Sequence, residues 1–329
     1  MQTQQALIIG THCAAIRLAL DLQEHPEIGI LPVAFVREDS SEIAFPPPDG
    51  PVPPVLGSLR DLPSLIQTRR VSVLFLTGDR ESTEEFVRDA VTATGTTVQI
   101  YRLRAFYEQV LKKIPSVCID ETWFVSERGF RLRTNPTDVA AKRVTDIAFG
   151  GLLAVSLSPV MLLAALAVRL DSPGPILYSQ IRTGKDGKPF RVFKFRSMYR
   201  DAEKQGARWA SEQDPRITRV GRFLRTSRVD ELPQLWNVLR GEMSLIGPRP
   251  ERPEFDRLLS EQIPHYEARY AIKPGLSGWA QVMYPYGASV DDAREKLAYD
   301  LYYIKNCSAF LDLLITWKTV LVVLFRKGR

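Results

Sequence analysis

The segment from Ile147 to Val168 constrains the fold more than any other part of the sequence, because its 22 residues carry no charge. About 20 consecutive apolar residues are enough to span a lipid bilayer as a helix. Ser158-Pro159 lies in the middle of the segment, and a proline there removes a backbone hydrogen bond and kinks the helix. The serine hydroxyl beside it can satisfy a freed carbonyl. Two topologies follow: a kinked helix that crosses the bilayer, or a re-entrant helical hairpin that enters and leaves by the same face.

Positive charge flanks this segment on both sides, with Lys142 and Arg143 before it and Arg169 after it. Lys and Arg are concentrated on the cytoplasmic side of membrane segments. Both ends are therefore predicted to lie at the cytoplasmic face, which favours a re-entrant helix over residues 140–170 in contact with inner-membrane phospholipid. A single span would place one domain outside the cytoplasm. A buried core helix is the remaining alternative, although a core helix of this length normally shows a polar stripe.

Charge is unevenly distributed along the chain. The net charge is +6, yet residues 1–130 contain 12 basic and 17 acidic residues, whereas residues 131–329 contain 32 basic and 21 acidic ones. Residues 182–228 alone contain 14 Lys or Arg and 5 Asp or Glu. The second part of the chain is therefore predicted to meet nucleic acid, membrane headgroups or a phosphorylated substrate. Nucleic acid is the least favoured, because neither interleaved aromatic residues nor a known binding motif accompanies the basic residues.

The first hundred residues alternate short apolar runs with helical patterns, which is typical of a parallel sheet with crossover helices. This predicts a Rossmann-like α/β domain over residues 1–125 and a linker over residues 126–137, followed by a second, mostly helical domain over residues 138–329. The first strand ends at Gly10, but the other two glycines of the dinucleotide-binding fingerprint are absent. A docking, regulatory or dimerisation role is therefore favoured over nucleotide binding, and His12 is predicted to be a turn residue.

The three cysteines, Cys13, Cys118 and Cys307, are isolated and lack the spacing of a disulfide framework or a zinc site. They favour a reducing, cytosolic environment. The N-terminus has neither the basic region nor the cleavage site of a secretory signal, so export is not expected.

A pair of adjacent carboxylates, Asp230 and Glu231, follows the arginine-rich stretch. Ser227 and Asp230 have the spacing of a capping box, and Pro233 is typical of a helix start, which predicts a helix N-terminus here. Among arginines, one carboxylate of such a pair could hold Mg²⁺ while the other attacks or accepts a proton, with the metal offsetting charge on a diphosphate. The spacing alone leaves open that Asp230 only caps the helix and that Glu231 only faces solvent.

A collinear series of motifs over residues 138–329 closely resembles the bacterial sugar transferases, which are monotopic polyprenyl-phosphate phosphoglycosyl transferases. The motifs are Lys142-Arg-x-x-Asp146, Ser158-Pro159, Asp171-Ser-Pro-Gly-Pro175, Lys194-Phe-Arg-Ser-Met198, Asp230-Glu-Leu-Pro-Gln-Leu-Trp-Asn-Val-Leu-Arg-Gly241, Met243-Ser-Leu-Ile-Gly-Pro-Arg-Pro250 and Lys273-Pro-Gly-Leu-Ser-Gly-Trp-Ala-Gln281. In this family Ser158-Pro159 would be the break of a re-entrant membrane hairpin.

The resemblance implies transfer of a sugar 1-phosphate from a UDP-sugar to polyprenyl (undecaprenyl) phosphate, with release of UMP, as the first membrane step of surface polysaccharide synthesis. Asp230 would be the nucleophile that forms a covalent aspartyl intermediate, and Glu231 together with Asp230 would hold Mg²⁺. The residues implied in substrate binding are Arg225, Arg249, Lys194, Arg196 and Gln281.

One motif departs from the family pattern. Many members follow Trp-Ala-Gln-Val with Asn-Gly-Arg, whereas this chain reads Met283-Tyr-Pro-Tyr-Gly-Ala-Ser289, so an arginine expected near the nucleotide is missing or replaced. That form resembles an exopolysaccharide branch linked to exosortase systems. The N-terminal domain resembles that of the long family members, which implies a homodimer at the cytoplasmic face of the inner membrane. A non-catalytic membrane-docked scaffold and a nucleotide-sensing regulator remain alternative functions.

Overall fold

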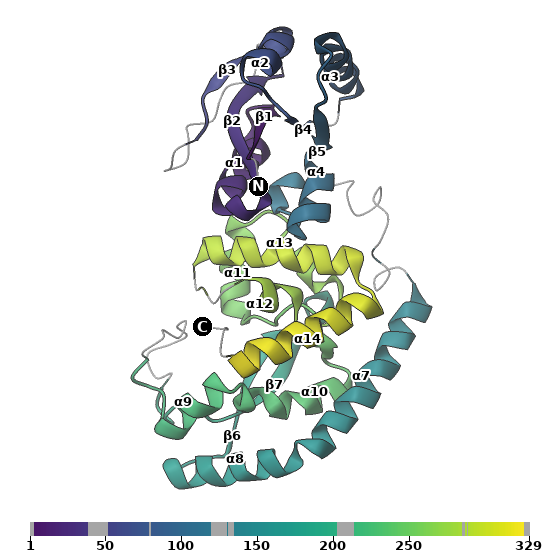
Figure 1. Cartoon of the computed structure of the whole chain (residues 1–329). Helices are drawn as coiled ribbons and strands as arrows, with labels where there is room; N and C mark the ends of the chain where they lie inside the picture. The colour runs from purple at the N-terminus through teal and green to yellow at the C-terminus, as the bar shows by residue number, and fades with distance from the viewer. Residues whose placement is uncertain are drawn as a thin grey trace. The chain divides into compact units, whose positions relative to one another are not determined.

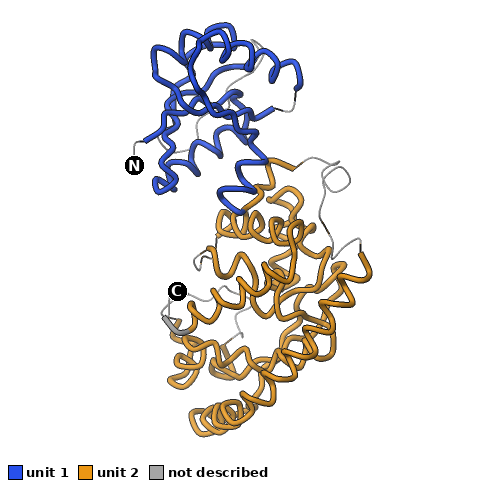
Figure 2. Tube along the Cα trace, turned by 45° about the vertical axis from the view of Figure 1, so that its right-hand side comes forward, with its two compact units in different colours: residues 1–112 blue, residues 113–329 orange. Residues whose placement is uncertain are grey.

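The computed structural model describes residues 3–38, 52–78, 80–119, 130, 135–202, 214–284, 287 and 289–325. The chain forms two compact units, Met1–Lys112 and Lys113–Arg329, which are coloured separately in Figure 2. The first unit thus ends earlier than the predicted boundary at residue 125. The reason is that the segment after Lys112 packs in the second unit, where the Ile114 amide donates a hydrogen bond to the Ala298 carbonyl. Of the predicted linker, residues 126–129 and 131–134 lie outside the described residues.

The first unit contains a five-stranded sheet in the order β3-β2-β1-β4-β5, with all neighbouring strands parallel. The predicted parallel α/β fold is therefore confirmed. Apolar strand residues such as Leu7, Ile9 and Leu74 are buried in the core that the sheet shares with its helices. The strands are β1 (Gln4–Ile9), β2 (Ile30–Arg37), β3 (Val55–Ser58), β4 (Val73–Leu76) and β5 (Gln99–Arg102), and the helices are α1 (Cys13–Glu24), α2 (Leu62–Thr68), α3 (Glu81–Thr94) and α4 (Leu103–Phe106).

The turn between β1 and α1 requires a glycine at position 10. Gly10 has a φ of +113°, and a side-chain carbon there would lie 2.2 Å from Oγ1 of Thr77. The Thr77 hydroxyl lies 2.9 Å from Nε2 of His12, the residue that precedes the first turn of α1. His12 is therefore a turn residue, as predicted.

The second unit is mostly helical, with short two-stranded sheets formed by β6 with β7 and by β8 with β9 (Figure 1). Its largest core contains Leu301, Tyr303 and Ile304 of α13, each at most 1% exposed. The helices are α7 (Pro136–Ser156), α8 (Ser158–Asp171), α9 (Arg219–Thr226), α10 (Leu235–Arg240), α11 (Pro253–Gln262), α12 (Trp279–Met283), α13 (Val290–Asn306) and α14 (Ala309–Phe325), and the strands are β6 (Leu177–Thr183), β7 (Pro189–Phe195), β8 (Ser244–Ile246) and β9 (Gly275–Ser277).

The uncharged segment forms two helices that meet at the predicted break. Helices α7 and α8 are bent by 58° between Ser156 and Ser158, and the Ser158 hydroxyl donates a 2.8 Å hydrogen bond to the Val155 carbonyl. Among the described residues, no single helix has the length and apolar character needed to cross a bilayer, whereas this bent pair meets both criteria when taken together. Large apolar side chains of the pair are exposed, which contradicts the core-helix alternative; for example, Val155 is 75% and Leu162 72% exposed.

The charged end of α7 is tied to the rest of the second unit by specific contacts. The Arg143 guanidinium donates 2.6 Å hydrogen bonds to the carbonyls of Val238 and Leu239, at the C-terminal end of α10. A cation is well placed there because carbonyls at a helix C-terminus lack helical partners. Lys142 makes a 2.7 Å ion pair with Asp312 of α14. Both residues, predicted from their charge to flank a membrane segment, thus also have protein partners.

Asp146, on the next turn of α7, is 4% exposed and links this helix to β8. One oxygen of its carboxylate accepts 2.9 Å hydrogen bonds from the Ser244 hydroxyl and from the Leu245 amide. Because a buried amide left without an acceptor is costly, this contact fixes the position of α7 against the strand.

We predict that Asp146→Ala lowers the free energy of unfolding by about 2–4 kcal/mol, since it leaves the Leu245 amide and the Ser244 hydroxyl without their buried acceptor. Chemical denaturation of the purified chain in a fixed detergent measures the change. The matched control is Thr145→Ala, because the Thr145 hydroxyl bonds only carbonyls of its own helix. Equal stability of the two variants would contradict the prediction.

Candidate active site

The adjacent carboxylates lie on a short 3-10 helix, η6 (Val229–Gln234), which follows α9. Arg228 adopts a left-handed conformation with a φ of +58°, and this turn redirects the chain from α9 into η6. The predicted capping box is wrong: the Ser227 hydroxyl donates instead to carbonyls of the preceding helix, those of Phe223 and Leu224. Asp230 and Glu231 are both buried, at 6% and 7% exposure.

Glu231 is held between two cations that come from different parts of the chain. The ammonium group of Lys194, on β7, lies 2.7 Å from Oε1 of Glu231. The Arg249 guanidinium, from the turn after β8, lies 2.6 Å from the same oxygen and 3.4 Å from Oε2. Burial alone would raise the pKa of Glu231, but the charges of Arg249 and Lys194 outweigh it and hold that pKa well below its usual range. Glu231 is therefore ionised at every physiological pH.

Asp230 has the opposite environment from its neighbour. Its Oδ1 is buried, and no described residue donates a hydrogen bond to it. Burial and, secondly, the negative charge of Glu231 raise the pKa of Asp230 to about 6, while the charges of Lys194, Arg225 and Arg228 partly oppose the shift. Asp230 thus ionises at a higher pH than an ordinary aspartate, and its Oδ1 is left without a hydrogen-bond donor in the described part of the chain.

Of the other residues predicted to bind substrate, Arg225 lies near the carboxylate pair, whereas Arg196 and Gln281 contact other parts of the second unit. Arg225, on α9, is close enough for its charge to act on Asp230, and its contact with a phosphate stays a prediction. Arg196 is buried and donates to the Ser172 and Pro173 carbonyls, at 2.6 and 3.1 Å, so it anchors the end of α8. Gln281, on α12, donates a 3.4 Å hydrogen bond to Leu276, and its buried Oε1 has no partner among the described residues. Substrate contacts of Arg196 and Gln281 stay predictions.

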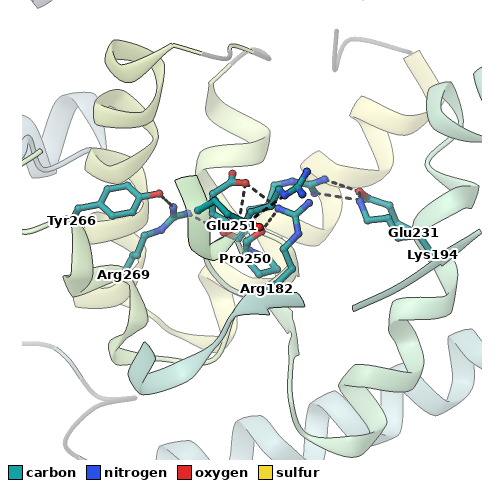
Figure 3. Close-up of polar contacts among 10 residues, drawn as sticks. Arg182, Lys194, Glu231, Pro250, Glu251, Tyr266 and Arg269 are labelled. Atoms are coloured by element: carbon teal, nitrogen blue, oxygen red, sulfur yellow. Dashed lines mark hydrogen bonds and ion pairs between the residues drawn. The ribbon is translucent and has the colours of Figure 1, made fainter. Parts of the chain in front are cut away.

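Arg249 is held in place by residues that the sequence motifs did not indicate. Arg269 donates a 2.9 Å hydrogen bond to the Arg249 carbonyl and makes a 2.9 Å ion pair with the buried Asp300. Beside them, the Arg182 guanidinium contacts Glu251 at 2.9 Å (Figure 3). Glu251 follows the Gly-Pro-Arg-Pro motif directly, which is the one local signal available. The long-range partners have no mark in the sequence.

Asp230 and Glu231 are also the residues predicted to hold Mg²⁺. Within the described ranges, no group of three or more His, Cys, Asp or Glu is arranged to hold a metal ion. Proteins often bind Mg²⁺ through one or two carboxylates together with substrate phosphates, and the pair suits that mode. Among the described residues, Oδ1 of Asp230 has no hydrogen-bond partner, and Oε2 of Glu231 has only the 3.4 Å contact with Arg249. Both oxygens therefore have coordination capacity left.

The comparison with known protein families shows which family this chain belongs to. The family model described as "Bacterial sugar transferase" matches residues 137–326, more than half of the chain. The chain therefore belongs to the bacterial sugar transferase family, which confirms the resemblance seen in the motifs. Membership of the exosortase-linked branch stays a prediction.

Three curated relatives illustrate the similarity. The "UDP-N-acetylgalactosamine-undecaprenyl-phosphate N-acetylgalactosaminephosphotransferase" of Aeromonas hydrophila is 39% identical over 267 residues, which cover 81% of this chain and 62% of that protein. Two further relatives are named "UDP-glucose:undecaprenyl-phosphate glucose-1-phosphate transferase". The protein from Caulobacter vibrioides is 46% identical, over 54% of this chain and 68% of that protein. The protein from Xanthomonas campestris is 30% identical, over 99% of this chain and 68% of that protein. The chain thus spans less than two thirds of the Aeromonas relative.

We predict that Asp230→Asn stabilises the fold at pH 8. The folded-state pKa of Asp230, about 6, lies above its ordinary value of 3.8, so ionisation of Asp230 destabilises the folded chain as the pH rises between these values. Asparagine does not ionise, so the variant gains up to about 3 kcal/mol above pH 6, and the gain disappears near pH 4. Denaturant unfolding at the two pH values measures it.

The control for this comparison is Asp291→Asn. The Asp291 side chain is 86% exposed, so its replacement is expected to change stability by less than about 0.5 kcal/mol at either pH. A variant Asp230→Asn that is less stable than the wild type at pH 8 would show that the folded chain does not penalise the ionised carboxylate.

Proposed function

We propose that this chain transfers a sugar 1-phosphate from a UDP-sugar to polyprenyl phosphate, with release of UMP, and so starts the synthesis of an exopolysaccharide or another surface glycan. The observation that carries the proposal is Oδ1 of Asp230, a buried carboxylate oxygen without a hydrogen-bond partner beside the clamped Glu231. The relatives' names point to the same pair of substrates.

Asp230 is the nucleophile in this mechanism. Its carboxylate attacks the phosphorus atom that carries the sugar, and the bond between that phosphorus and the UMP oxygen breaks, so UMP leaves with the bonding electrons. The product of this step is a sugar phosphoryl group bound to Asp230. An oxygen of polyprenyl phosphate then attacks the same phosphorus and releases the free carboxylate, which completes a double displacement.

The charged residues around Asp230 are proposed to bind the diphosphate and to keep Glu231 available for Mg²⁺. Arg225 and Lys194 supply positive charge beside Asp230, where the two phosphates of the UDP-sugar would lie. Arg249 and Lys194 keep Glu231 ionised, so Glu231 remains available as a metal ligand. When bound by Asp230 and Glu231, Mg²⁺ would supply charge neutralisation for the diphosphate. Glucose and galactose are the first sugars to test.

The bent pair of α7 and α8 is proposed as a re-entrant membrane segment that holds the chain on the cytoplasmic face of the inner membrane. The support is the 58° bend at Ser158-Pro159 together with the exposed apolar side chains on both helices, such as Val155 and Leu162. Basic residues at both ends of the segment favour a single side. In this topology the site would lie beside the membrane that carries polyprenyl phosphate.

We predict that Asp230→Asn lowers UMP release by at least about a thousandfold, because an amide oxygen is a far weaker nucleophile than a carboxylate. The measurement is UMP release from a panel of UDP-sugars with polyprenyl phosphate. Wild-type protein treated with UDP-sugar alone should also gain the mass of one sugar phosphate, and the variant should not. Asp291→Asn is the active control, and equal recovery in membranes shows that insertion is intact.

Unchanged turnover in Asp230→Asn would refute the nucleophile assignment. Wild-type protein that associates with membranes but releases no UMP with any UDP-sugar would favour the non-catalytic scaffold instead.

The re-entrant topology predicts that cysteines at Ala140 and at Pro175, on the two sides of the segment, both face the cytoplasm. Each is introduced alone into a background whose three native cysteines are replaced by alanine. In intact cells a membrane-impermeant maleimide should label neither, and in lysed cells it should label both, because both positions are exposed. Labelling of one position in intact cells would instead support a kinked span.

A further inference from the structure

A second concentration of positive charge lies apart from the carboxylate pair. A cavity of about 50 Å³ beside the first turns of α7 is lined by Lys142, Arg143, Lys185 and Lys273, with Asp146 as the one acidic residue. Lys185 begins the turn between β6 and β7, and Lys273 precedes β9. None of these residues is among the partners of Glu231, so the cavity is separate from the proposed catalytic centre.

The carboxylates near this cavity are already engaged. Asp146 accepts hydrogen bonds from the Ser244 hydroxyl and the Leu245 amide, and Asp312 pairs with Lys142. No described residue forms a hydrogen bond or ion pair with the ammonium group of Lys185 or of Lys273. Lys185, Lys273 and Arg143 thus face a single carboxylate in the lining, that of Asp146, and the cavity keeps a net positive charge.

Repulsion among these cations also indicates that the cavity carries a net positive charge. Burial lowers the pKa of Lys273, and the charges of Arg143 and Lys185 lower that pKa further, while Asp146 opposes them. An anion in the cavity would relieve this repulsion, and Arg143 has N–H groups left after its bonds to the two α10 carbonyls.

The size and position of the cavity narrow the choice of anion. One water needs at least about 10–15 Å³, so the 50 Å³ of this cavity admits a group with the few oxygens of a phosphate. Asp146 immediately precedes the uncharged segment that begins at Ile147. If that segment enters the membrane as proposed above, the cavity lies at the depth of the lipid headgroups.

We propose that this cavity binds a phosphate group, and that an anionic phospholipid of the inner membrane supplies it. Lys185 and Lys273 would donate to the phosphate oxygens, with Arg143 adding charge from α7. Such a contact would fix the depth of α7 at the membrane surface. The membrane part of this inference rests on the proposed function, whereas the phosphate site itself does not.

The test uses the full chain in a nonionic detergent. Isothermal titration calorimetry follows the binding of short-chain phosphatidylglycerol, of inorganic phosphate and of the matching diacylglycerol, which has no phosphate. The test variant is Lys185→Gln with Lys273→Gln, and the control is Lys188→Gln, an exposed residue of the same turn that does not line the cavity. Wild type and control should bind phosphatidylglycerol with equal affinity, and the double variant at least about tenfold more weakly.

The outcomes separate the two sources of phosphate. Binding of phosphatidylglycerol without binding of inorganic phosphate supports the lipid, and tighter binding of inorganic phosphate overturns the lipid while retaining the phosphate site. Binding of diacylglycerol with equal affinity, no saturable binding, or equal affinity in the double variant overturns the site. Lys185→Gln alone, in a partly exposed turn, provides a second variant if the double variant misfolds.

UMP release distinguishes failure of this inference from failure of the proposed function. In detergent with a short-chain polyprenyl phosphate, the double variant should keep UMP release within about twofold of wild type, because its substitutions lie outside the carboxylate site. Wild-type chain that binds phosphatidylglycerol but releases no UMP would refute the proposed function and leave the phosphate site standing.

Discussion

The second unit depends on the two ion pairs that Lys194 and Arg249 make with Glu231, which we call the Glu231 clamp. A carboxylate at 7% exposure is tolerated only where its charge is matched, and here Lys194 and Arg249 match it from two directions. The three groups come from β7, from η6 and from the turn after β8, so the clamp also joins these elements. Loss of either cation would leave a buried charge without its full compensation, which costs more than the pair itself contributes.

The clamp needs a rigid second layer, because a long arginine side chain positions its guanidinium only as well as its backbone is fixed. Arg269 bonds the Arg249 carbonyl and is itself neutralised by the buried Asp300. Helix α7 contacts β8 through Asp146, whose carboxylate accepts hydrogen bonds from Ser244 and Leu245, just before the Gly-Pro-Arg-Pro motif. The proposed membrane segment thus contacts β8, and the turn after β8 carries the arginine that pairs with Glu231.

Features that depend on neighbouring residues were predictable from the sequence. Alternation of apolar runs predicted the parallel sheet, and Ser158-Pro159 predicted the break between α7 and α8. Contacts between distant residues were not predictable, such as those of Arg143 with α10, or of Arg196 with the end of α8. The capping box failed for a related reason: its spacing ignores the preceding helix, whose carbonyls already accept from Ser227.

Two adjacent carboxylates would normally have similar pKa values, but in this fold the two pKa values shift in opposite directions. Glu231 receives both nearby cations and stays ionised, whereas Asp230 is buried beside that fixed negative charge and has a pKa of about 6. In the proposed mechanism, the negative charge of Glu231 would keep the ionised Asp230 from being over-stabilised by the surrounding cations, which would make it a poorer nucleophile. Because the two roles are set by environment, exchanging Asp230 and Glu231 would preserve the charge and still remove the arrangement, since only the second position reaches Lys194 and Arg249.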